Sequence, residues 1–199
     1  MDFKSMCPWP IVASLGIALL CVACSSPSDP DRASWMSAAI VEVREDAEEV
    51  DYTGTANFGR TGDFSIASRG NGASEDQTVI LVRAREGLPG EGSYVVRSFG
   101  TSDGGFGALY RRVQSDGTAE RFASVSGWAR ISESADDRVE GTFEFTAELF
   151  CSTPPGADQS PSCHPGAPIE GSVPVIVRGS FSAGPYGPVC RGSLGADCS

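Results

Sequence analysis

Alternation of apolar and polar residues is clearest over 138–150, RVEGTFEFTAELF. One parity holds Val139, Gly141, Phe143, Phe145, Ala147 and Leu149, whereas the other holds only Glu and Thr. A period of two with one polar face is typical of an antiparallel strand that covers a core on one side. The segment SVPVIVRGSF repeats the pattern, so we expect Val173, Val175, Val177 and Phe181 to face inward, with Arg178 and Ser180 facing outward.

Short β-prone runs separated by Gly, Pro and Asp continue along most of the chain. Such punctuation is typical of strands joined by turns. No long helical pattern intervenes, so βαβ crossovers are not expected. We therefore predict an all-β fold, an antiparallel meander that closes into a lipocalin-like barrel or a two-sheet sandwich of about eight or nine strands. The predicted strands are 38–43, 50–59, 62–69, 77–85, 92–99, 104–113, 119–132, 138–150 and 170–182.

The segment 35–50 fits two structures. Trp35, Ala39, Val43, Ala47 and Val50 fall near helical spacing, and AAIVEVREDAEEV contains good helix formers. Alternatively, AAIVEV and VDYTGTANF form the two strands of a hairpin. We expect the hairpin, with the helix as the alternative.

The N-terminus carries an export signal. Ile11 to Ala23 is an apolar run of 13 residues without a charge. As a helix it would span about 20 Å, which is less than the ~30 Å hydrocarbon core of a bilayer. The run is therefore predicted to be the apolar region of a signal peptide, residues 1–23, and not a transmembrane helix.

The junction Val22-Ala23-Cys24 resembles a bacterial lipobox, although Cys21 stands where that family prefers Leu. The resemblance implies cleavage after Ala23, lipidation of Cys24 and anchoring in the bilayer through its acyl chains. Ser25 at the next position resembles the sorting context of outer-membrane lipoproteins. Residues 24–34 would form a flexible tether, and the alternative is an ordinary secretory signal with an incidental cysteine.

Four cysteines follow the tether, namely Cys151, Cys163, Cys190 and Cys198. An even number in an exported chain suggests disulfides. We expect the pairs Cys151–Cys163 and Cys190–Cys198, because each encloses a short Pro/Gly-rich loop; a 13-residue loop contributes about 3 kcal/mol in the chain-entropy model. A zinc site with His164 is the rival, but the spacings lack the close cysteine pairs of structural zinc sites, and no metal or cofactor is expected.

Charge and composition exclude several functions. The net charge of −11 argues against nucleic-acid binding, which needs a basic face. His164 is the single histidine and lies in a loop, where it is poorly placed as a catalytic base. The acidic segment 42–51 is expected to be a solvated turn, with calcium as the alternative. Trp128 and Arg130 are predicted to point outward together.

Because the single histidine is poorly placed as a catalytic base, we expect no enzymatic activity.

The order YTGTANFG, DFSIAS, LPGEGSYVV, SGWARISES, RVEGTFEFTA and GSF resembles a class of exported bacterial lipoproteins. Members carry a P-G-x-Y turn and a later S-G-T-F-x-F strand. The resemblance covers most of 38–182 and implies a domain over 35–182, with 183–199 as a Gly/Pro/Cys-rich tail. It carries no catalytic residues.

The expected protein is thus a monomeric, non-enzymatic lipoprotein of the bacterial cell envelope, anchored at the outer membrane, that binds or supports another component. Two more specific roles remain open. One is an adaptor or inhibitor that offers disulfide-bounded loops to an envelope protein. The other is a lipocalin-like carrier of a small apolar ligand inside the barrel.

Overall fold

The computed structural model describes residues 33–60, 62–101, 103–157 and 163–186. These residues form an all-β domain of nine strands with one short 3₁₀ helix, η2 (Gly72–Ser74). The strands are β1 (Trp35–Glu42), β2 (Glu49–Gly59), β3 (Phe64–Gly70), β4 (Thr78–Arg83), β5 (Gly92–Arg97), β6 (Phe106–Val113), β7 (Ala119–Ser134), β8 (Val139–Thr153) and β9 (Val175–Pro185). The predicted all-β fold class is confirmed.

The alternation read from the sequence sets which faces are buried. In β8 the odd positions from Val139 to Ala147 are buried, and the Glu and Thr positions between them are not. The prediction for β9 was wrong at one position, because Val173 is 39% exposed. Pro174 has no amide proton to give to a sheet, and β9 begins only after it, at Val175.

The segment 35–59 is a hairpin and not a helix. β1 pairs antiparallel with β2, with Met36 opposite Gly54 and Val41 opposite Glu49. Its inward positions Met36, Ala38 and Ile40 alternate with exposed or half-buried ones, as a strand requires. Helix propensity is therefore overridden here by pairing on both sides, since β1 also pairs with β9 along its whole length.

The strands close into a ring of hydrogen bonds in the order β1-β2-β3-β4-β6-β5-β7-β8-β9. The ring is mostly antiparallel but departs from the predicted meander, because β5 lies between β6 and β7. The strands β5 and β6 run in the same direction where they meet, and Val96 pairs in parallel with Phe106. A second short parallel pairing joins Phe58 of β2 to Pro185 of β9.

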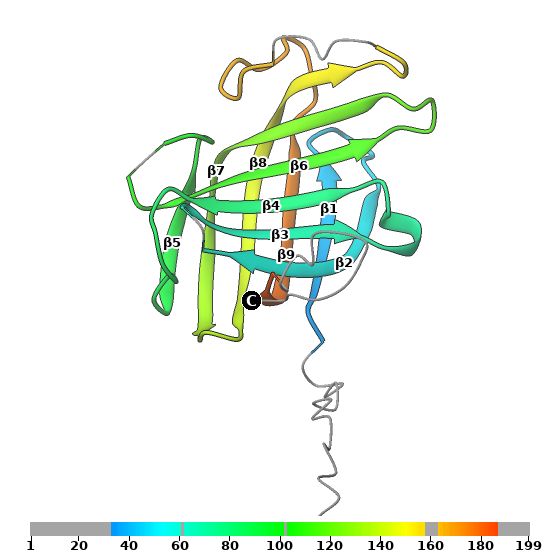
Figure 1. The fold of residues 1–199 in the computed structure, drawn as a ribbon. Coiled ribbons are helices and arrows are strands. Elements are labelled where there is room, and N and C mark those ends of the chain that lie inside the picture. Colours follow the sequence, from blue (N-terminus) through cyan, green and yellow to red (C-terminus); the bar gives the residue numbers. More distant parts are fainter. Residues whose placement is uncertain (1–32, 61, 102, 158–162, 187–199) are drawn as a thin grey trace, which may run out of the picture.

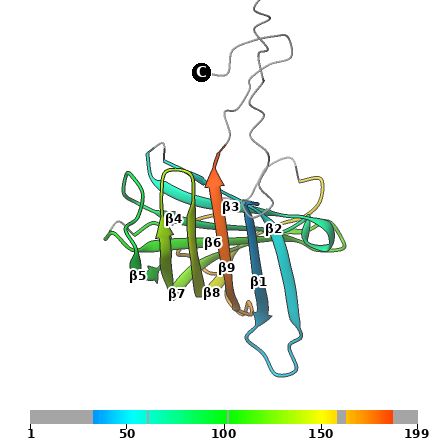
Figure 2. The same ribbon diagram turned by 90° about the horizontal axis from the view of Figure 1, so that it is seen from below.

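The ring is flattened into two layers whose strands run across each other (Figure 1). One layer contains β2, β3, β4 and β6; the other contains β5, β8, β9 and β1, of which β8, β9 and β1 stand side by side in Figure 2. The strand β7 belongs to both layers, because Ala119–Ala123 pair with β6 and Ser126–Ile131 pair with β5. Strands that turn such corners do so at irregularities. In β7 the register shifts between Ser124 and Ser126.

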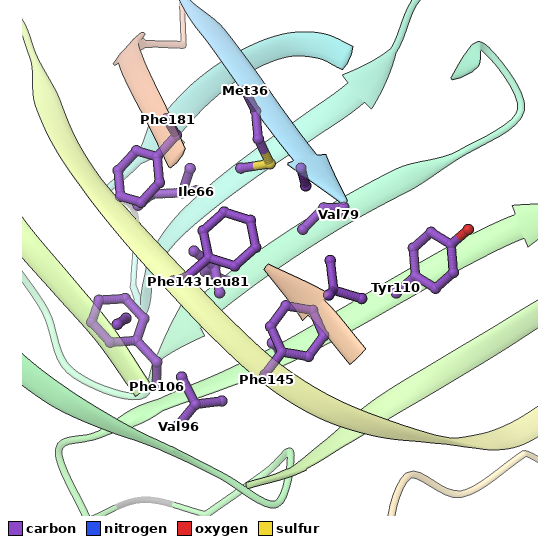
Figure 3. Close-up of a cluster of buried hydrophobic side chains, with 14 of the residues drawn as sticks. Met36, Ile66, Val79, Leu81, Val96, Phe106, Tyr110, Phe143, Phe145 and Phe181 are labelled. Carbon is purple, nitrogen blue, oxygen red and sulfur yellow. The ribbon is translucent and has the colours of Figure 1, made fainter. Parts of the chain in front are cut away.

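The space between the layers is filled by apolar side chains. Figure 3 shows Ile66, Leu81 and Phe106 of one layer pointing toward Phe143 and Phe181 of the other. The rings of Phe143 and Phe181 lie 6.3 Å apart, and those of Tyr94 and Phe106 meet edge to face at 5.4 Å across the corner between β5 and β6. Among the described residues, no buried side-chain nitrogen or oxygen lacks a hydrogen-bond partner.

We predict that Gly127→Ala lowers the free energy of unfolding by about 3 kcal/mol or more, which chemical denaturation would measure. Gly127 follows the bend of β7 with φ +152°, and an added Cβ would overlap the backbone of Glu144 and Phe145. Gly87→Ala is the matched control, because Gly87 has φ +81° but open space around it. It should cost about 1–2 kcal/mol, and equal losses in the two variants would contradict the account.

Candidate functional site

Three connections gather at one end of the domain. They are residues 43–48 between β1 and β2, 114–118 between β6 and β7, and 154–174 between β8 and β9. The amide of Val43 donates to the carbonyl of Pro174 at 2.8 Å, and Gly117 lies against the ring of Pro155. We call this region the loop end (top of Figure 1).

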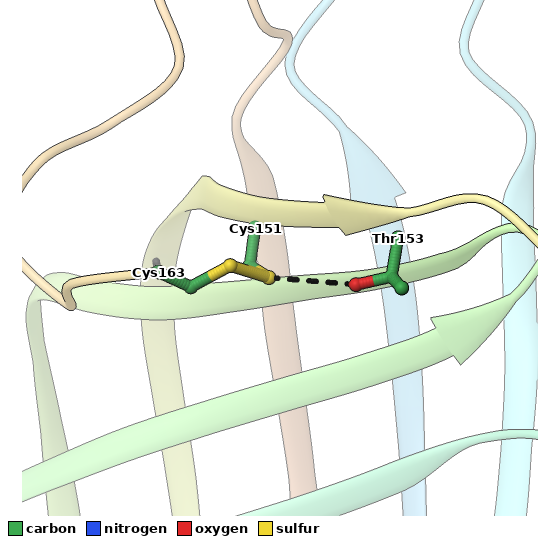
Figure 4. Close-up of a disulfide and its surroundings, with 3 residues drawn as sticks. All are labelled: Cys151, Thr153 and Cys163. Atoms are coloured by element: carbon green, nitrogen blue, oxygen red, sulfur yellow. Dashed lines mark hydrogen bonds between the residues drawn. A yellow bond between two sulfur atoms is a disulfide. The ribbon is translucent and has the colours of Figure 1, made fainter. Parts of the chain in front are cut away.

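A disulfide holds the longest of these connections against the sheet. Cys151, buried on β8, is bonded to Cys163, as predicted from the short enclosed loop (Figure 4). Thr153 Oγ1 lies 3.7 Å from Cys151 Sγ, in hydrogen-bond contact. Farther along, the amide of Ile169 donates to the carbonyl of Leu149 at 2.7 Å. The connection is therefore tied to β8 at two points.

A polar hollow of about 530 Å³ opens between the β1–β2 turn, the segment that follows β3, and the end of β6. Ile40 and Tyr110 are the part of its lining that belongs to the core. The rest of its lining is largely charged or amide-bearing, including Glu42, Gln77 and Arg112. This hollow is our candidate site.

Arg112 organises the charges of the hollow. Its guanidinium donates to Glu120 Oε2 at 2.6 Å and to Glu42 Oε1 at 3.0 Å, and it lies 5.2 Å from the centre of the Phe122 ring. Gln114 also donates to Glu120, at 2.8 Å, and Arg44 pairs with Glu42 at 2.8 Å. Burial opposes the charge of Arg112, but the two carboxylates outweigh it, so its pKa lies above the ordinary value. The two carboxylates thus stabilise the charge of this half-buried guanidinium.

Two tyrosines are buried in the core, and one of them, Tyr110, lines the hollow. Tyr110 donates to Gln77 Oε1 at 2.8 Å, and Tyr52 donates to Ser68 Oγ at 2.8 Å. Burial raises the pKa of both phenols above the ordinary value, and the nearby charge of Arg112 offsets this only partly at Tyr110. Both groups therefore act as neutral hydrogen-bond donors.

Of the acidic segment 42–51, predicted as a solvated turn, only residues 43–48 form the β1–β2 connection, in which Asp46 has φ +62°. The prediction was wrong for Glu42, which ends β1 and is half-buried in its contact with Arg112. His164 lies at the loop end, directly after the disulfide cysteine. Trp128 points outward and is 44% exposed, with Arg130 exposed beside it, as their parity in β7 predicts. Cys24, Cys190 and Cys198 lie outside the described residues.

The lining of the hollow limits its chemistry. Its described residues include no Ser, Thr, Cys or His, so it holds neither an aliphatic hydroxyl or thiol nucleophile nor an imidazole base for acyl transfer. In the described part of the chain, no group of three or more His, Cys, Asp or Glu side chains is placed to hold a metal ion. Within the same residues no helix is long and apolar enough to span a membrane. The hollow suits recognition of polar groups through hydrogen bonds.

The network around Arg112 was not predicted from the sequence. Glu42 and Arg112 stand 70 positions apart and meet only because ring closure brings the ends of β1 and β6 together. Only the contact between Arg112 and Glu120 has a weak signal in the sequence. The two residues flank a tight turn at positions that oppose each other in a hairpin.

Comparisons with known proteins identify no relative: no family model, no curated protein and no solved structure matches the chain.

We predict a loss of stability above about pH 10 that Tyr110→Phe reduces. The raised pKa means that the folded state favours the neutral phenol more than the unfolded chain does, so this contribution is intact below the ordinary tyrosine pKa of about 10 and is lost as pH rises through the higher folded pKa. Deprotonation of lysine side chains cannot obscure the effect, because Lys4 is the only lysine in the chain. Denaturation at pH 7 and at pH 10.5 measures it, and an equal decline in both proteins would contradict the role of Tyr110.

Proposed function

We propose that the protein is a lipid-anchored, non-enzymatic binding module of the bacterial cell envelope. Its anchor would be Cys24, and its binding surfaces would lie at and beside the loop end. The single observation that carries the proposal is that Ser34, where the predicted tether would join β1, and the loop end lie at opposite ends of the same strands.

Contacts within the domain support this placement at opposite ends. Ser34, the last residue before β1, accepts a hydrogen bond from the amide of Gly184 at 3.0 Å, at the end where Val139 pairs with Ala183. The eight residues of β1 then run about 23 Å to Glu42, at roughly 3.3 Å a step. A lipid on Cys24 would thus hold the β7–β8 turn toward the bilayer and turn the loop end away from it.

The packed interior argues for binding at the surface. The described inward positions carry large rings, such as Phe58, Phe143, Phe145 and Phe181, that are at most 2% exposed. An internal carrier of an apolar ligand needs a hollow, apolar-lined interior, whereas the 530 Å³ hollow is polar and opens at one end. We therefore do not favour the carrier.

The disulfide favours a recognition role for the loop end. The described residues 163–174 are tied to β8 by the Cys151–Cys163 disulfide and by the Ile169 amide, which lowers the entropy they lose when a partner binds. The adaptor interpretation gains support from this preorganisation, with an envelope component as the partner.

The anchor is tested by replacing the cysteine that would carry the lipid. We expect Cys24→Ala to move most of the protein from the membrane fraction to the soluble fraction, because without Cys24 no acyl chains are attached. Cys21→Ala is the matched control, and it should leave the protein in membranes, because the bulky Leu20 precedes Cys21 and makes it a poor lipobox cysteine.

Fractionation followed by mass spectrometry of the N-terminal peptide reads out both variants. A soluble wild type, or a Cys24→Ala protein that stays in the membrane as the wild type does, would refute the lipid anchor. If Cys21→Ala released the protein from the membrane and Cys24→Ala did not, the lipid would be on Cys21 and the assignment to Cys24 would be wrong.

A further inference from the structure

A second hollow lies on the outer face of the sheet, beneath the disulfide-bonded loop. Its volume is about 400 Å³, within the range of small-molecule sites. Ile80, Leu109 and Phe150 supply apolar lining from β4, β6 and β8, and Pro165 covers it from the loop. We call this hollow the outer groove.

Two arginines stand beside this apolar lining. Arg111 of β6 lies directly opposite Arg121 of β7, and both line the outer groove. Two residues away on the same face, Ile80 lies opposite Leu109. Because residues two apart on a strand share a face, a basic row runs next to an apolar row.

Arg111 and Arg121 place two like charges directly opposite each other. Like charges directly opposite each other destabilise a sheet, and no hydrogen bond or ion pair of the Arg111 or Arg121 side chain is found among the described residues. Some other arginines, such as Arg60, Arg112 and Arg178, pair with a carboxylate. In a chain of net charge −11, two adjacent arginines with no carboxylate partner in the described part of the chain form a place where an anion can bind.

We propose that the outer groove binds a small anionic amphiphile, a molecule with one carboxylate and an alkyl body. The carboxylate would lie between the guanidinium groups of Arg111 and Arg121 and relieve their repulsion. The alkyl chain would lie on Ile80, Leu109 and Phe150, beneath Pro165. The proposal deepens the proposed binding role but does not depend on the lipid anchor.

The test titrates the full chain with decanoate, with decanol as the uncharged probe of equal chain length, by isothermal calorimetry. Decanoate should bind at least tenfold more tightly than decanol. Arg111→Gln and Arg121→Gln should each weaken decanoate binding about tenfold and leave the weaker decanol binding unchanged. Arg130→Gln is the matched control, because Arg130 is an exposed arginine of β7 that lies on the other layer, and it should bind as the wild type does.

A second readout locates the probe. Decanoate with a terminal diazirine, irradiated with the full chain, should cross-link to peptides that contain Leu109 or Phe150. Equal affinity for decanol and decanoate, unchanged binding in the two arginine variants, or cross-links only outside the outer groove would each overturn the proposal. Because this experiment does not involve Cys24, its failure leaves the anchored module intact, and failure of the anchor leaves the outer groove intact.

Discussion

The domain depends on the bend of β7. One strand pairs with β6 through its first residues and with β5 through its later ones, so it hydrogen-bonds both layers of the ring. The register shift at Ser124 and Ser126 turns the strand, and Gly127 follows in a conformation that L side chains rarely adopt, pressed against the backbone of β8. Without this corner, two small sheets would each have an open edge and half a core.

Closure of the ring also sets where chemistry can occur. Because side chains from both layers fill the interior, ligand sites are left to the ends of the ring and its outer faces. The polar hollow forms where the ends of β1 and β6 meet, and Arg112 holds carboxylates from two different strands there. The outer groove forms where the disulfide lays the 154–174 connection over the sheet. Both lie away from the end at which β1 begins.

Local patterns were predictable from the sequence, and long-range pairings were not. Alternation in 138–150 gave the buried face of β8, and parity gave the outward position of Trp128. The insertion of β5 between β6 and β7 left no local signal, since only pairing across the ring distinguishes it from a meander. The same holds for the charge network around Arg112 and for the pairing of Arg111 with Arg121, because register decides which residues face each other. The lipobox prediction stays a prediction, since Cys24 lies outside the described residues.

Native-state amide hydrogen exchange tests the central claim, that β7 joins two layers into one cooperative core. The slowest amides of β3 and β4 should exchange with the same free energy as those of β8 and β9, because opening either layer exposes the shared interior. Their exchange should also respond to denaturant with the same slope. If β8 and β9 stayed protected while β3 and β4 exchanged at a much lower free energy, the layers would be separate units and the account would be contradicted.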